Sequence, residues 1–249
     1  MSSINPKIRA TQEQYNVLHT EASMGWGGQE IRVFEEMINM RKKGHKMCLA
    51  APRESIIFIK ALEAGIRTWD LDVRNFMFPL SIFRLAFRMR NEGVQVVNTH
   101  SSADGWIGGL AGRLAGTPLI IRSRHIEVDY KERTSSRLGF GKLPHHVLTT
   151  SERISDGLVS ALDLNPDRVD CIPTGIDLDQ FHQKIKGNLH NELGLAGDVP
   201  LIGMVSVIRS WKGHDYFVEA AKIVAQSSPN VRFVVAGGGN DRRLEKIQR

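Results

Sequence analysis

Near its carboxyl end the chain reads Val205-Ser206-Val207-Ile208-Arg209-Ser210-Trp211-Lys212-Gly213, and a second apolar segment that ends in glycines follows at Val231 to Gly239. Each segment has the form of a buried strand that runs into a turn. The first turn carries Arg209 and Lys212. Open parallel sheets bind ligands outside the carboxyl ends of their strands, so this guanidinium and ammonium are placed to hold a diphosphate.

The same rhythm extends back through the chain, where apolar segments alternate with amphipathic ones, as is typical of strand–helix–strand units and a parallel sheet. We expect strands at Tyr15–Thr20, Lys46–Ala51, Arg67–Leu71, Val94–Thr99, Leu119–Arg122, His146–Thr149, Arg168–Ile172, Leu201–Val207 and Arg232–Ala236. We expect a first helix that starts after Gly27-Gly28 and ends at about Lys42 and Lys43. We expect further helices at Ser55–Ala64, Leu80–Asn91, Ala103–Ala115, from Ser151, at His214–Gln226 and from about Asp241. Spacing predicts that the first helix buries Ile31, Phe34, Met37 and Ile38.

The rhythm breaks after Ile172, where Pro173 to Asp177 has the composition of a turn and Gln180 to Asn191 is polar. We therefore expect an α/β protein with two Rossmann-like lobes. Residues 1–179 would form one complete parallel-sheet lobe and residues 180–199 a linker. Residues 200–249 would form the first part of a second lobe.

Composition favours a globular protein, since 41% of the 249 residues are hydrophobic. No apolar run approaches the roughly 20 residues that cross a bilayer, and Met1 to Gln14 lacks the apolar centre of a secretory signal, which predicts a cytoplasmic location. Cys48 and Cys171 lie in apolar segments without metal-ligand spacing, so we expect buried free thiols.

The formal net charge of +6 is spread over three basic clusters, Arg32 to Arg53, Arg84 to Arg90 and Arg122 to Lys142. Such clusters are either solvated helix faces or a surface that contacts an anionic membrane peripherally. Nucleic-acid binding is not expected, because the charge lacks interleaved aromatic residues and no recognised module is present.

Seven short motifs occur in an order that resembles a known family, from Val17 to about Leu244. They are Gly27-Gly28-Gln29-Glu30, Asn98-Thr99-His100-Ser101, Arg122-Ser123-Arg124-His125, Thr150-Ser151-Glu152, Ile172-Pro173-Thr174-Gly175-Ile176-Asp177, Arg209 to Gly213 and Ala236-Gly237-Gly238-Gly239. The order is similar to that of the retaining glycosyltransferases of family 4, also called group 1, which have the GT-B fold of two Rossmann-like domains.

The resemblance implies site residues. Gly27 and Gly28, at the start of a helix, would approach the donor phosphate and the acceptor. Arg209 and Lys212 would hold the donor diphosphate and offset charge on the leaving group, with Gly238 near the nucleotide and no metal ion or other cofactor required.

His125 matches the family's cleft histidine, and His100 competes for that assignment. Each feature also has a plain structural interpretation: a tight turn, a structural histidine, and two exposed cations at a strand end.

The resemblance implies transfer of a sugar from a nucleotide diphosphate sugar to a glycan or lipid-linked acceptor, in the synthesis of cell-surface polysaccharide or lipopolysaccharide. Thr174 stands where the family commonly has asparagine, and the family's Glu-x7-Glu motif is absent after Lys212, so we expect a chain truncated within its second domain. The alternative is an inactive fragment, or a binding lobe that needs a partner chain to supply the donor half. A dinucleotide-dependent oxidoreductase is disfavoured, because G-x-G-x-x-G is missing at Met24 to Glu30.

Overall fold

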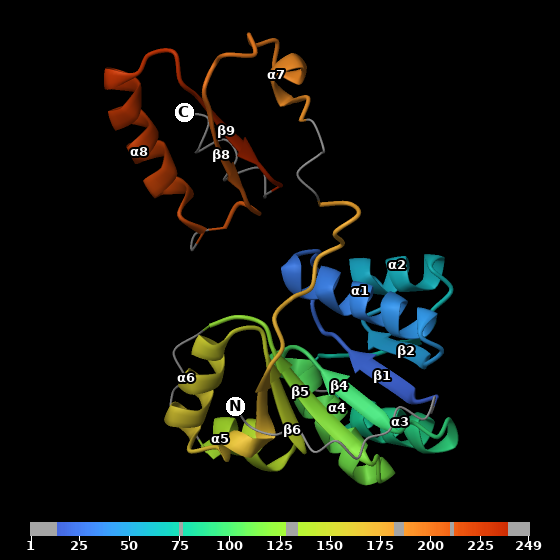
Figure 1. Cartoon of the computed structure of the whole chain (residues 1–249). Coiled ribbons are helices and arrows are strands. Elements are labelled where there is room, and N and C mark those ends of the chain that lie inside the picture. The colour runs from blue at the N-terminus through green and yellow to red at the C-terminus, as the bar shows by residue number, and fades with distance from the viewer. Residues whose placement is uncertain (1–13, 75–76, 128–133, 182–186, 210–211, 239–249) are drawn as a thin grey trace. The chain divides into compact units, whose positions relative to one another are not determined.

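Figure 1 shows a computed structural model of the chain, which describes residues 14–74, 77–127, 134–181, 187–209 and 212–238. The chain divides into two compact units, residues 1–175 and 176–249. Each unit is considered by itself below.

The first unit is built on a seven-stranded sheet in the order β3-β2-β1-β4-β5-β6-β7, and every neighbouring pair is parallel. Its strands are β1 (Asn16–Thr20), β2 (Lys46–Ala51), β3 (Arg67–Asp70), β4 (Val96–Thr99), β5 (Leu119–Arg124), β6 (His146–Thr149) and β7 (Val169–Cys171). The strand order reverses between β1 and β4, so the carboxyl ends of these two strands form the switch point at which such sheets bind ligands.

Helices cover both faces of this sheet. Helices α1 (Gly28–Lys42) and α2 (Ile56–Glu63) lie on one face, and α3 (Phe78–Asn91) and α4 (Ser102–Ala115) lie on the other (Figure 1). Further along the chain come α5 (Thr134–Arg137), a π-helical turn at Leu138–Lys142, α6 (Glu152–Leu162) and a 3-10 turn at Pro166–Arg168.

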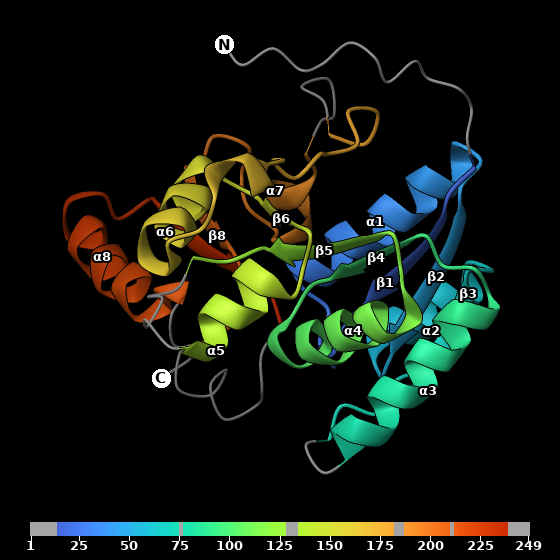
Figure 2. The same ribbon diagram turned by 90° about the horizontal axis from the view of Figure 1, so that it is seen from below.

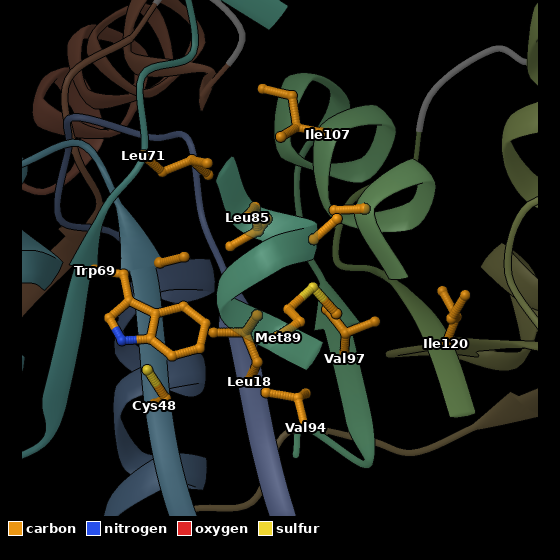
Figure 3. Packing of buried hydrophobic residues seen from close by; sticks show 13 residues of the cluster. Leu18, Cys48, Trp69, Leu71, Leu85, Met89, Val94, Val97, Ile107 and Ile120 are labelled. Atoms are coloured by element: carbon orange, nitrogen blue, oxygen red, sulfur yellow. The ribbon is translucent and has the colours of Figure 1, made fainter. Parts of the chain in front are cut away.

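The core therefore has two layers. Side chains of α3 and α4 pack on one face of the sheet with Leu18, Trp69 and Val97 (Figure 3), while those of α1 and α2 pack on the other with Val17 and Leu49. A Cβ added to Gly108 of α4 would lie 2.8 Å from Cγ2 of Thr99. This distance confirms that the small residues of α4 allow it to approach the sheet closely.

The predicted strands and helices that fall on described residues are confirmed to within two residues at either end, and Ser55 and Ser151 are the N-caps of α2 and α6. On the first helix, Met37 is buried as predicted and Phe34 and Ile38 pack against the core, but Ile31 was predicted wrongly, since it is 42% exposed while Glu30 and Val33 are buried. Glu30 faces inward because its carboxylate accepts a hydrogen bond from the amide of Gly27.

Two further expectations need correction. Cys48 is a buried free thiol, but Cys171, on the last strand β7, is only half-buried. The segments Thr134–Arg137 and Leu138–Lys142, which were not expected to be helical, form α5 and the π turn.

The second unit contains a parallel pair of strands, β8 (Leu201–Val205) and β9 (Arg232–Ala236), with α7 (Leu189–Glu192) and α8 (His214–Ser227). Helix α7 lies partly within the polar run that was expected to be a linker, and the helix expected from Asp241 lies outside the described residues. In the described part of this unit only Ile208 and His214 are buried. Within the chain as described, no helix has both the length and the apolar character needed to cross a bilayer.

Candidate functional site

Three histidines form a hydrogen-bonded chain at the carboxyl ends of β1, β4 and β5. Nδ1 of His19 lies 2.9 Å from Nε2 of His100, and Nδ1 of His100 lies 2.9 Å from Nε2 of His125. His19 belongs to β1, whereas His100 and His125 directly follow β4 and β5. The rings of His19 and His100 are stacked, with an interplanar angle of 4°. The histidine chain, as we call these three residues, thus spans the switch point.

The tautomers of the three rings link the protonation of the nitrogen at one end of the histidine chain to that of the nitrogen at the other end. A neutral imidazole donates through one nitrogen and accepts through the other, so both hydrogen bonds must point in the same direction. Nε2 of His19 and Nδ1 of His125 are buried and have no hydrogen-bond partner among the described residues. One of these two terminal nitrogens therefore carries a proton and the other a lone pair.

Burial keeps the histidine chain neutral. Desolvation lowers the pKa of His19 and lowers the pKa of His100 well below 6.5. Desolvation, with Arg32 nearby, lowers the pKa of His125 to about 4. At neutral pH all three rings are therefore uncharged hydrogen-bonding groups.

Asp104, in the first turn of α4, fixes the geometry of the switch point. It is fully buried, and its carboxylate accepts hydrogen bonds from Oγ1 of Thr20 at 2.8 Å and from the amides of His100 and Ser101 at 2.9 Å each. The hydroxyl of Ser101 donates to the same carboxylate. Asp104 thereby ties the end of β1 to the turn that carries His100.

Glu21 immediately follows β1 and is also fully buried. Its carboxylate accepts hydrogen bonds from the amide of Ser23 at 2.9 Å and from Nε2 of Gln29 at 2.6 Å. Burial, with Asp104 nearby, raises its pKa to about 8. Glu21 is therefore mostly protonated at neutral pH and holds the turn against the first helix without adding a negative charge.

Gly27 and Gly28 lie where the sequence places them, as the N-cap and first residue of α1. Gly27 has a φ of −140°, an extended conformation that any residue adopts, so backbone strain does not explain this glycine. A Cβ added to Gly28 would meet no atom within 4 Å. The helix amino terminus is thus open to an approaching group.

Arg32 of α1 anchors the segment that leads out of the first unit. Its guanidinium donates to the carbonyl of Ile172 at 2.8 Å and to Oγ1 of Thr174 at 3.0 Å. Thr174, which replaces the asparagine expected by resemblance, therefore serves as a hydrogen-bond acceptor here.

The other predicted cations lie in the second unit. Arg209 and Lys212 are exposed, and the amide of Lys212 donates to the carbonyl of Arg209 at 3.1 Å, so one turn carries both side chains. A Cβ added to Gly237 would lie 1.9 Å from the carbonyl oxygen of Ser206, whereas one added to Gly238 would meet nothing within 4 Å. Gly237 is therefore required by close backbone packing, and Gly238 leaves space beside the turn.

Two family models match the sequence. The model for Glycosyltransferase Family 4 matches residues 26–180, and that for Glycosyl transferases group 1 matches residues 185–248. The chain belongs to glycosyltransferase family 4. His100, His125, Asp104, Gly27 and Gly28 lie within the first match, His19 precedes it, and Arg209, Lys212 and Gly238 lie within the second.

Relatives in this family include UDP-Gal:alpha-D-GlcNAc-diphosphoundecaprenol alpha-1,3-galactosyltransferase of Escherichia coli, which is 30% identical over 179 residues. That match covers 67% of this chain and 46% of the relative. D-inositol 3-phosphate glycosyltransferase of Mycobacteroides abscessus is 27% identical over 202 residues, which is 73% of this chain and 43% of the relative. The chain therefore spans less than half the length of either relative.

Solved structures show the same fold. A glycosyltransferase from Rickettsia africae matches with a TM-score of 0.77 and 18% identity, over 94% of this chain and 64% of that one. Anabaena Alr3699/HepE in complex with UDP and glucose matches with a TM-score of 0.74 and 14% identity, over 94% of this chain and 65% of that one. The family 4 chain thus has a GT-B-like fold, with one complete Rossmann-like lobe and part of a second.

Sequence reasoning identified His125 and treated His100 as its rival, but the structure makes them hydrogen-bonded neighbours. It did not identify His19, Glu21 or Asp104. For Asp104 a signal existed, because Ser101-x-x-Asp104 is a capping-box pattern at the start of a helix. No group of three or more His, Cys, Asp or Glu side chains in the described ranges is arranged to hold a metal ion.

Proposed function

We propose that this family 4 chain acts as a retaining glycosyltransferase, which moves a sugar from a nucleotide diphosphate sugar to a glycan or lipid-linked acceptor. The observation that carries the proposal is a family match that spans both units, together with buried polar groups at the switch point of the first sheet. Residues 1–179 would form the acceptor lobe, residues 180–199 a linker and residues 200–249 part of the donor lobe.

In this mechanism Arg209 and Lys212 bind the diphosphate and stabilise the negative charge that grows as the sugar leaves. Two cationic side chains on one turn can supply this stabilisation without a metal ion or another cofactor. Gly28, at the open amino terminus of α1, offers backbone amides to an anion, and Gly238 leaves room for the nucleotide beside the cationic turn.

His125 would position the substrate as a hydrogen-bond acceptor. The negative charge of Glu36 acts on His19 and favours a proton at that end of the histidine chain, while the positive charge of Arg32 disfavours a proton at His125. Both effects leave the lone pair on Nδ1 of His125. This nitrogen is buried in the described structure, so a sugar hydroxyl would donate to it only once the side chains that cover it move aside. Nitrogen-15 NMR of the imidazoles tests this direction, and Glu36→Gln should shift the tautomer populations toward a proton on Nδ1 of His125.

A uridine diphosphate sugar and a lipid-linked acceptor are the first substrates to test. The Escherichia coli relative is named for UDP-Gal and a diphosphoundecaprenol-linked sugar, and neighbouring structures contain UDP or UDP-glucose. Such an acceptor would place the protein in the cytoplasm at the inner face of a membrane, with products that enter cell-surface polysaccharide or lipopolysaccharide.

Calorimetric titration with UDP tests the donor assignment. The variant Arg209→Ala/Lys212→Ala should bind UDP about a hundredfold more weakly, because two hydrogen bonds from charged groups are lost. The matched control is Lys222→Ala/Arg232→Ala, which removes two exposed cations from the same unit. Equal affinity in wild type and the Arg209/Lys212 variant would refute the assignment.

The alternative is a catalytically inactive fragment, or a binding lobe that needs a partner chain to supply the donor half. An assay with radiolabelled nucleotide sugars separates the two functions. Turnover by this chain alone would eliminate the alternative. Binding of UDP without turnover would favour it.

A further inference from the structure

The outer face of α3 carries large apolar side chains in an unbroken row. Leu80, Phe83 and Phe87 are 41%, 64% and 68% exposed, and their spacing of three and four residues places them on one side of the helix. The opposite side buries Leu85 and Met89 in the core. Figure 2 shows α3 in the outer layer of the first unit, with this helix and α4 side by side.

The row continues onto α4. Leu110 and Leu114, one turn apart, are 36% and 55% exposed. A groove of about 590 Å³ between the two helices is lined by Phe83, Phe87 and Leu114, together with Arg84, Ala86 and Arg90. Single exposed apolar residues are ordinary, but a contiguous apolar patch marks a surface that contacts a membrane or another protein.

The arginines that border this patch outnumber the acidic side chains near them. The side chains of Arg84, Arg88 and Arg90 are exposed and make no hydrogen bond or ion pair with any residue that the structure describes, although Asp72, which is paired with Arg74, lies within electrostatic range of Arg84. Helix α3 contains no acidic residue, and the carboxylate of α4, Asp104, is buried. Of the three basic clusters in the sequence, this is the one built beside exposed phenylalanines.

The positive charge of this surface favours an anionic lipid surface over a second copy of the chain as its partner. A second copy of the chain seated on this face by a two-fold axis would bring two sets of three arginines together, and the carboxylate near them, Asp72, is already paired with Arg74. An anionic lipid surface offers phosphates to the arginines and an apolar layer to the phenylalanines at the same time. An amphipathic helix with arginine at the border and phenylalanine on the apolar side has the composition of a helix that lies at the membrane interface.

We propose that this surface, formed by Leu80, Phe83, Phe87, Leu110, Leu114, Arg84, Arg88 and Arg90, docks the first unit on an anionic phospholipid bilayer. The phenylalanines enter the boundary between headgroups and acyl chains, and the arginines contact lipid phosphates. The docking does not depend on the transfer reaction and is measured without it.

Co-sedimentation of the whole chain with vesicles tests the proposal. Wild type should bind phosphatidylcholine vesicles that contain phosphatidylglycerol, with a partition coefficient that falls as salt rises, and should bind pure phosphatidylcholine weakly. Arg84→Gln/Arg88→Gln/Arg90→Gln should lower partitioning on the order of a hundredfold, at about 1 kcal/mol for each arginine near the surface. Phe83→Ser/Phe87→Ser should lower it at least about tenfold, because both rings lose their burial in lipid.

Matched variants elsewhere separate this surface from general charge or apolarity. Lys42→Gln/Lys43→Gln/Lys46→Gln removes the same charge from another basic cluster, and Ile59→Ser/Leu62→Ser removes exposed apolar groups from α2. Both should bind vesicles as wild type does, and circular dichroism should show all variants folded. The proposal is overturned if the controls lose as much binding as the α3 variants, or if wild type does not bind anionic vesicles. It is also overturned if wild type is a dimer that Phe83→Ser/Phe87→Ser makes monomeric.

Discussion

Replacing Glu21 with glutamine should change how stability depends on pH. In the native state this carboxyl has a pKa raised from 4.5 to about 8 by burial and by Asp104. The folded protein therefore keeps a proton that the unfolded chain releases between these pH values, so wild type loses stability as pH rises through this window. Glutamine is nearly isosteric, so it can accept from the amide of Ser23 and bond to a reoriented amide of Gln29.

The size of the effect follows from the shift. At about 1.4 kcal/mol per pH unit, a rise from 4.5 to about 8 costs wild type about 3 kcal/mol at pH 7 and about 5 kcal/mol above pH 9, relative to acid pH. Glu21→Gln removes this cost. The free energy of unfolding of the variant, relative to that of wild type, should therefore rise steadily from pH 5 to pH 9.

The histidine chain has the opposite effect on how stability depends on pH. Its members have native pKa values below 6.5, so the unfolded chain takes up protons that the native state does not, and stability falls as pH drops below about 6.5. Wild type should be most stable near pH 6.5, where the two trends cross. In Glu21→Gln the decline on the alkaline side should disappear while the decline on the acid side remains.

Urea unfolding at a series of pH values measures this difference, followed by circular dichroism or by the fluorescence of the buried Trp69. Glu63→Gln is the matched control, because it removes an exposed carboxylate at the end of α2 and should leave the wild-type profile unchanged. The reasoning fails if wild type and Glu21→Gln give parallel curves between pH 5 and pH 9.

Three further outcomes are expected. Asp104→Ala should lower the free energy of unfolding by about 3 kcal/mol or more, because buried donors lose their acceptor. Chemical denaturation should show a smaller loss for Asp104→Asn. An unfolding free energy that Asp104→Ala leaves nearly unchanged would contradict these hydrogen bonds. Nitrogen-15 NMR at pH 7 should show the three rings of the histidine chain neutral, and titration of any of them at or above 6.5 would contradict their burial. Hydrogen exchange should be at least about tenfold faster in β8 and β9 than in β1 and β4, because the described part of the second unit buries few side chains; equal protection would contradict this.

Much of the fold could be predicted because local signals agree with each other. Each strand of the first sheet is an apolar run bounded by turns, and serine caps mark the first residues of α2 and α6. Ile31 was predicted wrongly because hydrophobic spacing alone cannot show that the neighbouring Glu30 turns inward to cap its own helix. A local hydrogen bond here outweighed the apolar pattern.

The candidate site was less accessible from sequence, because its residues become neighbours only through strand order. His19 and His100 are 81 residues apart, and His100 and His125 are 25 apart. The register that pairs His19 with Asn98 puts His100 two residues further along the same face of the sheet. Without that register, His100 and His125 compete for one role instead of sharing a hydrogen bond.

Charge is distributed unequally between the polar groups of the two units, and this division bears on what each can bind. In the first unit the histidine chain is neutral, Glu21 is mostly protonated at neutral pH, and Asp104 already accepts four hydrogen bonds. In a chain with a net charge of +6, the switch point thus presents uncharged donors and acceptors, which suit the hydroxyl groups of a sugar better than a phosphate. Under the proposed function, the exposed cations Arg209 and Lys212 of the second unit would bind the phosphate instead, so the two kinds of group would belong to different lobes.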